Sequence, residues 1–378
     1  MIGPATAEKG GRRLRIGVDV REWKSGTSTG IARILTNFLR WATAQTSHEF
    51  VLFGDQNTEA RVEAPTISAR FERQRNTFAW DQLELPRLLA AESVDVFLSP
   101  YYKGPLRAPC PVVVTVNDLI ELRYPDAASA VKRAVLPFWM KRVLRRAALV
   151  LTLSEFSRRD IVATLGIDED RIRVIPLGLE NGLRSPPTAE AVSHATETYG
   201  IPPRSVLYLG RCSPHKNVPT LIAAWARLGS NLRTAHPLVL AGSDVERFRA
   251  AASGTPGIHF PGFIADSDVA AVYGSATVFC FPSLYEGFGL PPLEAMGCGV
   301  PVIASNAASM PEVLGEAALL VDATDPSKWH DALERVLVNE ELRSTLTRSG
   351  ADRAAGYTWK RAAPVMVRLL EEAARTRS

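Results

Sequence analysis

The feature that most constrains the fold is a repeated alternation of short apolar runs, rich in β-branched residues, with longer segments of helical period. The alternation occurs twice in the 378-residue chain, and a Gly- and Pro-rich stretch at 176–190 separates the two series. Alternating strands and helices are typical of α/β domains with parallel sheets. Because the chain is also too long for one ordinary core, we expect two doubly wound, Rossmann-like domains.

The elements expected in each series follow from these patterns. Strands of the first series are expected at 14–20, 49–54, 94–99, 111–117, 148–154 and 172–178, with helices at 30–45, 79–92, 130–147 and 155–165. Strands of the second series are expected at 205–210, 237–242, 257–262, 277–282, 300–305 and 317–322, with helices near 217–228, 266–274, 290–298 and 327–338. Doubly wound domains bind ligands at the carboxyl ends of their strands, which predicts a cleft between the domains if those edges face each other.

The composition is that of a globular protein and excludes a disordered or fibrous one. Hydrophobic residues make up 46% and charged residues 22% of the chain, as in globular proteins. The net charge of +4 suits an anionic ligand or an anionic membrane surface without requiring either, and we expect no nucleic-acid partner. The four cysteines show no C-x-x-C spacing, so we interpret them as reduced thiols and not as zinc ligands or disulfides.

Two carboxylates flank a glycine–proline turn in "LYEGFGLPPLEAMGCGVP" (284–301), Glu286 before the turn and Glu294 after it. A helix that begins near Leu290 would carry Glu294 on its first or second turn. Such a pair suits a glycosidase, a metal site, or a site that binds the hydroxyls of a diol. Since the nearest histidines follow other strands, and hydrolases rarely place such a pair beside a phosphate-type turn and two cations, hydroxyl binding is the favoured interpretation.

The chain carries candidate phosphate-binding features but neither a Walker A motif nor a G-x-G-x-x-G motif. Glycine turns precede expected helices at Gly30 and Gly289, where a helix N-terminus offers N–H groups and partial positive charge to an anion. Arg211 and Lys216 follow the first strand of the second series. They would neutralise a pyrophosphate if they face the same sheet edge as Glu286. The alternative is a pair of solvated surface cations.

The stretch "SLYEGFGLPPLEAMGCGVPVIAS" resembles the E-x7-E signature of retaining GT-B glycosyltransferases of family GT4. Agreement in order and spacing extends to "STGIARIL", "VVVTVNDLIELRYP", "LTLSEFSRRDI", "VIPLGLE", "LGRCSPHKN", "PGFIADSDVAAVYGSATVFCFPS" and "SMPEVLGEAALLVDATD". The resemblance covers nearly the whole chain and is nearest to bacterial mannosyltransferase-like members that build O-antigens and other surface glycans. It implies a GT-B fold with an acceptor domain over 1–178, a donor domain over 179–357, and a C-terminal helix over 358–378 that crosses back to the first domain.

The resemblance also implies roles for individual residues. Glu294 would hold the ribose hydroxyls of a sugar nucleotide, and Glu286 the 3- and 4-hydroxyls of its sugar. Arg211 and Lys216 would neutralise the diphosphate, with Gly30 closing on it from the first domain. Backbone groups would contact the distal phosphate and sugar at Phe288, Gly289 and Leu290, and the nucleobase at Phe263 and Ile264. Neither a cofactor nor a metal ion is expected, because the family is metal-independent.

One position departs from the family pattern. Asn117-Asp118 stands where the family usually has His-Asp, and that His contacts the donor sugar near its 6-position. Asn can hydrogen-bond there but cannot carry charge or shuttle a proton. Our hypothesis is that Asn117 tunes the choice of donor, for instance toward a 6-deoxy sugar. The alternative is neutral change at a tolerant position.

The expected function is therefore retaining transfer of a sugar from a nucleoside-diphosphate sugar to a glycan or lipid-linked acceptor in surface polysaccharide or glycoconjugate biosynthesis. GDP-mannose is the favoured donor, followed by UDP- and dTDP-sugars. Retention without an evident nucleophile favours front-face attack, with Glu286, Asn117, Arg211 and Lys216 as the catalytic residues. The alternatives are a non-catalytic sugar-nucleotide-binding partner of another transferase, a nucleotide-sugar epimerase of the same fold, and an NAD-type oxidoreductase.

The expected location is cytoplasmic, with a peripheral position at the inner face of the cell membrane as an alternative. The first 20 residues lack the apolar stretch of a secretion signal, and no apolar run approaches the roughly 18 residues needed to span a bilayer. The segment 131–150 carries six basic residues and no acid, together with Phe138 and Trp139. It would bind an anionic membrane surface, or it is the solvated face of an ordinary helix.

Overall fold

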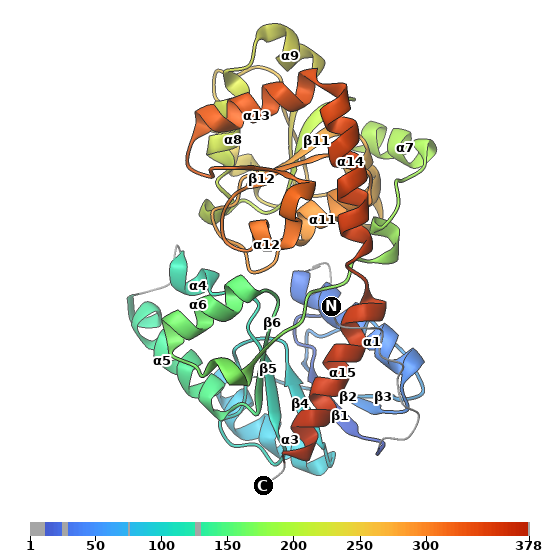
Figure 1. Ribbon diagram of the computed structural model, residues 1–378. Coiled ribbons are helices and arrows are strands. Elements are labelled where there is room, and N and C mark those ends of the chain that lie inside the picture. Colours follow the sequence, from blue (N-terminus) through green and yellow to red (C-terminus); the bar gives the residue numbers. More distant parts are fainter. Residues whose placement is uncertain (1–11, 25–28, 75, 125–129, 377–378) are drawn as a thin grey trace. The chain divides into compact units, whose positions relative to one another are not determined.

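The computed structural model describes residues 12–24, 29–74, 76–124 and 130–376, with side chains from Ala134 onward in the last range. The chain divides into two compact units, residues 1–178 with 358–378 and residues 179–357. Each unit contains one parallel sheet with helices around it (Figure 1).

The first unit is built on a seven-stranded sheet in the order β3-β2-β1-β4-β5-β6-β7. Its strands are β1 (Arg15–Asp19), β2 (Glu49–Asp55), β3 (Ile67–Glu72), β4 (Val96–Ser99), β5 (Val112–Thr115), β6 (Leu149–Thr152) and β7 (Ile172–Val174). All neighbouring strands pair in parallel. The chain begins at a central strand and winds outward in both directions, which is the doubly wound topology expected from the sequence.

Helices of the first unit cover both faces of this sheet. They are α1 (Gly30–Gln45), α2 (Thr77–Ala79), the π-helical turn η1 (Trp80–Glu84), α3 (Leu85–Ala91), α4 (Ile120–Arg123), α5 (Ala130–Arg146), α6 (Glu155–Leu165), the 3-10 turn η2 (Glu169–Arg171) and α15 (Trp359–Arg375). Helix α15 lies beside α1 and buries an apolar stripe that includes Met366 and Leu370 against the strands (Figure 1). The expected return of the C-terminal helix to the first sheet is therefore confirmed.

The second unit repeats the architecture with a six-stranded sheet in the order β10-β9-β8-β11-β12-β13. Its strands are β8 (Ser205–Leu209), β9 (Leu238–Ala241), β10 (Ile258–Gly262), β11 (Ala276–Phe281), β12 (Val302–Ser305) and β13 (Leu319–Val321). Its helices are α7 (Ala189–Tyr199), α8 (Val218–Ala226), α9 (Ser230–Ala235), α10 (Val269–Gly274), α11 (Leu290–Gly297), α12 (Met310–Leu314), α13 (Pro326–Val338) and α14 (Glu340–Ala355), with 3-10 turns η3 (Asn181–Leu183), η4 (Pro214–Lys216), η5 (Val245–Arg249), η6 (Asp266–Asp268) and η7 (Gly315–Ala317).

The sequence prediction missed several elements that bury little apolar surface. Strand β3, "ISARFE", is an edge strand with no fully buried residue and has only β2 as a neighbour. Helix α7 buries Ala195 alone, and α14 buries only Leu346, Gly350 and Ala354. Without a clear apolar stripe or run, such segments give a weak periodic signal. In the described part of the chain, no helix is both long and apolar enough to cross a membrane.

The carboxyl ends of β8 and β9 approach each other closely. A Cβ atom on Gly242 would lie 2.2 Å from the carbonyl oxygen of Gly210, and Gly242 has a φ of +122°. The Gly242 N–H donates to the Gly262 carbonyl at 2.7 Å, which continues the sheet past β9. Both the close approach and the backbone conformation therefore require glycine at this sheet edge.

We expect Gly242→Ala to lower the free energy of unfolding by about 2–4 kcal/mol, because alanine strains the backbone and forces the strand ends apart. Urea denaturation measures this change. Gly182→Ala, at an exposed position of the 3-10 turn η3, is the matched control, since φ there is not positive and no described atom lies within 4 Å of the added Cβ. The control should stay within about 0.5 kcal/mol of wild type, and an equal loss in both variants would contradict the assignment.

Candidate functional site

Neighbouring strands β8 and β11 bring the predicted donor-site loops together at the carboxyl edge of the second sheet. The segment after β8 leads into η4, which ends at Lys216, and the segment after β11 leads into α11. The Leu284 N–H donates to the His215 carbonyl at 2.7 Å and joins the two segments. The two loops that the sequence predicted at one sheet edge are therefore in contact.

Lys216 and Glu286 form an ion pair within these segments. The Lys216 Nζ atom lies 2.6 Å from Oε1 of Glu286, and the two side chains are 16% and 11% exposed. The ammonium group also lies 5.1 Å from the ring centroid of Phe281, the last residue of β11. A charge pair that is largely removed from water is screened less than a surface pair, so it fixes the position of both groups.

Glu294 lies on the second turn of α11, one of the two turns that the sequence predicted, and is 3% exposed. It has a different hydrogen-bond partner from Glu286, because the Tyr273 hydroxyl donates to Oε2 of Glu294 at 3.1 Å. Burial, together with the nearby Glu294 charge, raises the pKa of the Cys298 thiol to about 12. Cys298 is therefore an uncharged packing residue.

The turn between the two glutamates is held from α12. The Ser309 hydroxyl contacts the carbonyl oxygens of Glu286 and Phe288 at 2.9 and 3.0 Å. Gly289 has a φ of +97°, and a Cβ there would lie 2.2 Å from Cε of Met310. Glycine is thus required immediately before α11 by both conformation and packing.

The N-terminus of α11 offers fewer donors than an ordinary helix start. Pro291 and Pro292 lack N–H groups, so among the first four helical positions only Leu290 and Leu293 carry one. The Phe288 ring packs edge-to-face on Tyr357, with centroids 5.6 Å apart, and keeps the preceding turn in place. An anion at this helix end would depend more on nearby cationic side chains than on backbone donors.

The side chain of Arg211 is much more exposed to solvent than that of Lys216. Its side chain is 73% exposed, and its Nε atom lies 3.5 Å from Oδ2 of Asp244. Its backbone is fixed, because the Tyr208 hydroxyl donates to the Arg211 carbonyl at 3.0 Å. The exposed guanidinium can therefore turn toward a ligand without changes in the backbone.

Phe263 and Ile264 follow β10, one of the two edge strands of the second sheet. Phe263 is 63% exposed, whereas Ile264 is 4% exposed. The next residue, Ala265, donates its N–H to the Tyr199 hydroxyl at 3.2 Å. The turn is thus anchored behind an exposed aromatic ring.

Gly30 and Asn117 belong to the first unit. Gly30 is the first residue of α1, is exposed, and would place a Cβ with no atom of the described chain within 4 Å. Its φ is not positive, so neither packing nor backbone conformation explains the glycine.

Asn117 follows β5, and its buried Oδ1 atom has no hydrogen-bond partner among the described residues. It borders a cavity of about 30 Å³, enough for one or two waters. That cavity is otherwise lined mainly by apolar side chains, such as those of Leu35 and Met366 from α1 and α15.

Sequence reasoning missed the supporting residues Tyr273 and Ser309. Ser309 precedes a proline-containing helix start, a signal that could have marked it as a structural residue. Tyr273 gives no comparable signal, because an aromatic residue in an apolar helix is ordinarily read as core.

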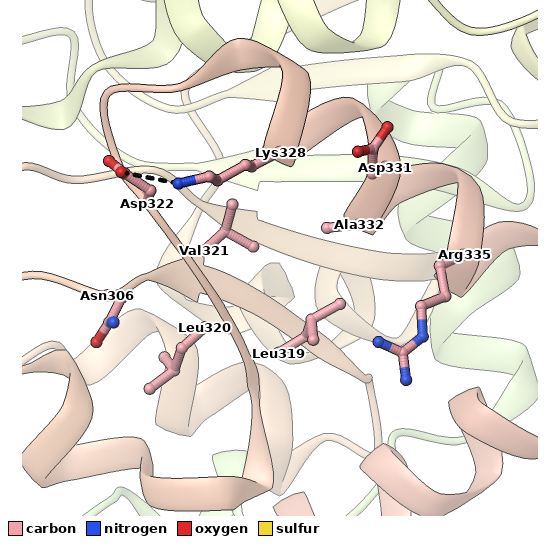
Figure 2. Close-up of a pocket in the computed structure, with 9 residues that line it drawn as sticks. All are labelled: Asn306, Leu319, Leu320, Val321, Asp322, Lys328, Asp331, Ala332 and Arg335. Atoms are coloured by element: carbon pink, nitrogen blue, oxygen red, sulfur yellow. Dashed lines mark hydrogen bonds and ion pairs between the residues drawn. The ribbon is translucent and has the colours of Figure 1, made fainter.

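A separate pocket of about 610 Å³ lies between the edge strand β13 and helix α13 (Figure 2). An ion pair between Lys328 and Asp322, at 3.3 Å, spans part of it. The remaining lining residues are Asn306, Leu319, Leu320, Val321, Asp331, Ala332 and Arg335. None of the predicted site residues lines this pocket, so it is distinct from the site of Glu286 and Glu294.

A buried charge network lies at the end of β1 in the first unit. Arg21 contacts Asp19 at 2.5 Å and Asp81 at 2.7 Å, and all three residues are buried. Burial raises the pKa of Asp81 to about 6, since the Arg21 guanidinium that would lower it is shared with Asp19. The π-helical turn η1 that carries Asp81 thus holds a carboxyl group that titrates near neutral pH.

We expect this network to make stability pH-dependent. The folded protein binds a proton at Asp81 more tightly than the unfolded chain, so this carboxyl lowers stability as pH rises from about 4 to about 6. Compared with wild type, Asp81→Asn should therefore gain about 2–3 kcal/mol between pH 4 and pH 7. Chemical denaturation at several pH values measures the difference.

Asp352→Asn, at an exposed position of α14, is the matched control and should show no such trend. A difference between Asp81→Asn and wild type that stays constant with pH would show that Asp81 titrates normally in the folded protein.

Comparisons with known proteins agree with the two-unit architecture. Residues 28–181 match the family described as Glycosyltransferase Family 4, and residues 198–353 match Glycosyl transferases group 1. O-antigen chain mannosyltransferase B from Escherichia coli is 34% identical over 229 residues, which cover 57% of this chain and 58% of that protein. The match thus spans less than two thirds of the relative's length.

Solved structures with little sequence identity share the fold. Sucrose-phosphate synthase from Thermosynechococcus elongatus superposes with a TM-score of 0.74 at 21% identity, over 95% of this chain and 99% of that one. Anabaena HepE, solved with UDP and glucose, gives a TM-score of 0.71 at 17% identity, over 96% and 100% of the two chains. These structures show that the chain has a GT-B fold, and the two family matches show that it belongs to the glycosyltransferases of family GT4.

Proposed function

We propose that this protein transfers a sugar from a nucleoside-diphosphate sugar to a glycan or lipid-linked acceptor in the biosynthesis of a surface polysaccharide or glycoconjugate. The observation that carries the proposal is the ion pair of Lys216 with Glu286, near a second buried carboxylate, Glu294, at one sheet edge. The similarity to a mannosyltransferase from Escherichia coli supports mannose as the transferred sugar. GDP-mannose is our favoured donor, with UDP- and dTDP-sugars next.

The geometry supports a division of roles along the donor. Lys216 is held by Glu286, so a phosphate bound to the ammonium would lie next to hydroxyls bound to the carboxylate. That is the arrangement of a sugar and the phosphate attached to it. Glu294, on the following helix, would accept both hydroxyls of the ribose.

The remaining assignments follow the family roles. Arg211 joins Lys216 at the diphosphate. For Gly30 and Asn117 of the first unit, the roles that the family resemblance implies, at the diphosphate and at the donor sugar, stay predictions. Backbone groups at Phe288, Gly289 and Leu290 serve the distal phosphate and sugar, and those at Phe263 and Ile264 the nucleobase.

The proposed chemistry is front-face transfer with retention. The bond from the anomeric carbon to the β-phosphate oxygen breaks, and the acceptor oxygen bonds to the same face. The acceptor proton passes to the departing phosphate. Lys216 and Arg211 stabilise the negative charge on that phosphate without a metal ion, while Glu286 positions the sugar.

The closest alternatives are a non-catalytic sugar-nucleotide-binding partner of another transferase and an epimerase of the same fold. The first would bind donor without forming a glycoside. The second would convert the sugar nucleotide without an acceptor.

Donor binding and transfer test the proposal directly. We expect one of GDP, UDP or dTDP to raise Tm with or without magnesium, while NAD has no effect; at about 100 times its Kd, a ligand adds about 2.7 kcal/mol of stability.

With the matching sugar nucleotide, Glu286→Gln should lower kcat by at least about 100-fold, because the sugar is no longer held for transfer. Transfer rates of Asn117→His with GDP-, UDP- and dTDP-sugars test whether Asn117 tunes the choice of donor. If the rates relative to one another equal those of wild type, this hypothesis is contradicted.

Glu334→Gln, at an exposed position of α13, is the matched control and should keep wild-type kcat. Donor binding without transfer to any acceptor would favour the non-catalytic alternative. A near-normal kcat in Glu286→Gln would contradict the role given to that residue.

We further propose that α5 binds an anionic membrane surface. Its exposed positions Val135, Phe138, Arg142 and Arg145 recur at helical spacing, so they form one stripe with an apolar half and a basic half. Trp139 contacts Phe78 of α2, with ring centroids 5.4 Å apart, and Phe78 is itself 61% exposed. The side chains of Lys132 and Arg133 lie outside the described residues.

Vesicle flotation tests this surface. We expect binding to vesicles that contain anionic lipid but not to neutral ones, and at least a tenfold loss in Arg142→Glu/Arg145→Glu, since each basic residue near the surface contributes about 1 kcal/mol. Arg335→Glu/Arg348→Glu changes the same charge on exposed positions of α13 and α14 and should bind like wild type. Equal binding to neutral and anionic vesicles would contradict an electrostatic surface.

A further inference from the structure

A row of buried aromatic rings connects the surroundings of the two glutamates. Phe279 and Phe281 lie two residues apart on β11, on the same face of the strand, and both are 0% exposed. Their rings are stacked, with centroids 6.1 Å apart. Tyr273 of α10 extends the row, since its ring packs edge-to-face on Phe279 at 5.2 Å.

Each end of this aromatic row contacts one charged group of the site. At one end, the Tyr273 hydroxyl donates to Glu294 at 3.1 Å, and Tyr273 is only 1% exposed. At the other end, the Phe281 ring faces the Lys216 ammonium at 5.1 Å, and that ammonium pairs with Glu286. Phe279, in the middle, contributes packing alone.

The contact at Tyr273 constrains the carboxylate of Glu294. A carboxylate that must accept two hydroxyls of a diol needs both oxygens at a fixed angle. The hydroxyl of a fully packed tyrosine supplies that constraint, because a ring that is only 1% exposed has little room to move. A phenylalanine at position 273 would keep the packing and remove only the donated hydrogen bond.

The contact at Phe281 constrains the ammonium of Lys216. The lysine side chain has four rotatable bonds, and Glu286 fixes its end from one side only. The ring face supplies a second attraction through its quadrupole. A leucine at position 281 would fill most of the same space without attracting the cation.

We propose that Tyr273 and Phe281 are positioning residues with separate tasks: Tyr273 orients Glu294 for donor binding, and Phe281 orients Lys216 for turnover. This inference rests on the proposed function, because it takes Glu294 as a ribose ligand and Lys216 as the group that stabilises the leaving phosphate. Neither residue touches the donor itself. Their effects should therefore separate into Kd and kcat, which loss of packing alone would not do.

The test compares Tyr273→Phe, Phe281→Leu and Phe279→Leu, with donor Kd measured by calorimetry, kcat by steady-state transfer, and Tm as the measure of folding. We expect Tyr273→Phe to raise donor Kd about tenfold with kcat within twofold of wild type, the loss expected for a hydrogen bond to a charged group. Phe281→Leu should lower kcat about five- to tenfold, with a smaller change in Kd. Phe279→Leu, the matched control, should lower Tm. At temperatures below its unfolding transition, its donor Kd and kcat should stay within twofold of wild type.

A second comparison keeps the test decisive if the leucine variants fold poorly. When Glu294 is already changed to Gln, Tyr273→Phe should alter Kd by less than twofold, because its effect acts through that carboxylate. An undiminished effect in the Glu294→Gln background would overturn the inference, as would equal changes of Kd in Tyr273→Phe and Phe279→Leu. A Phe281→Leu enzyme with wild-type kcat would overturn the task given to Phe281.

The outcome for wild type separates this inference from the proposed function. If wild type binds no nucleoside-diphosphate sugar, both fail together. If wild type binds and transfers sugar while Tyr273→Phe and Phe281→Leu behave like wild type, the inference fails and the proposed function stands.

Discussion

The parallel pairing of β8 with β11 is the constraint on which the donor site depends. It brings the segment after β8 against the segment after β11, so that Lys216 and Glu286 meet as a largely buried ion pair. Strand β11 also carries Phe279 and Phe281 of the aromatic row. After β11 the chain turns at Gly289 and begins α11, the helix that carries Glu294. One strand pairing therefore brings Lys216 to two glutamates, the nearer of which follows it by 70 residues in the sequence.

The sequence predicted the sheets well because most of their strands are buried on both faces. Runs such as "VFLS" in β4 and "VIAS" in β12 have no exposed residue, so their apolar, β-branched character is visible without any tertiary information. Strand β3 was missed because its edge position allows exposed charged residues such as Arg70 and Glu72. The placement of Glu294 within the first two turns of α11 was also predictable, because two prolines and a glycine mark the helix start.

The contacts that hold the site were much less predictable. The hydrogen bond from Tyr273 to Glu294 links two helices, and the contacts of Ser309 with the carbonyls of Glu286 and Phe288 bridge more than twenty residues of chain. The carboxyl of Asp81 meets Arg21 only because a π-helical turn points it toward the end of β1. Such pairings depend on three-dimensional packing, and a periodic pattern along the chain contains no information on them.

Because of helix α15, the two units can complete their hydrophobic cores at different times during synthesis. The core of the first unit includes Ala363, Met366 and Leu370, which the ribosome adds after all of the second unit has been made. Residues 179–357 hold every strand of their own sheet and can close their core while the chain is still growing. Until α15 is made, the first unit has part of its apolar surface uncovered. Of the two units, the one whose strands are made first therefore completes its core second.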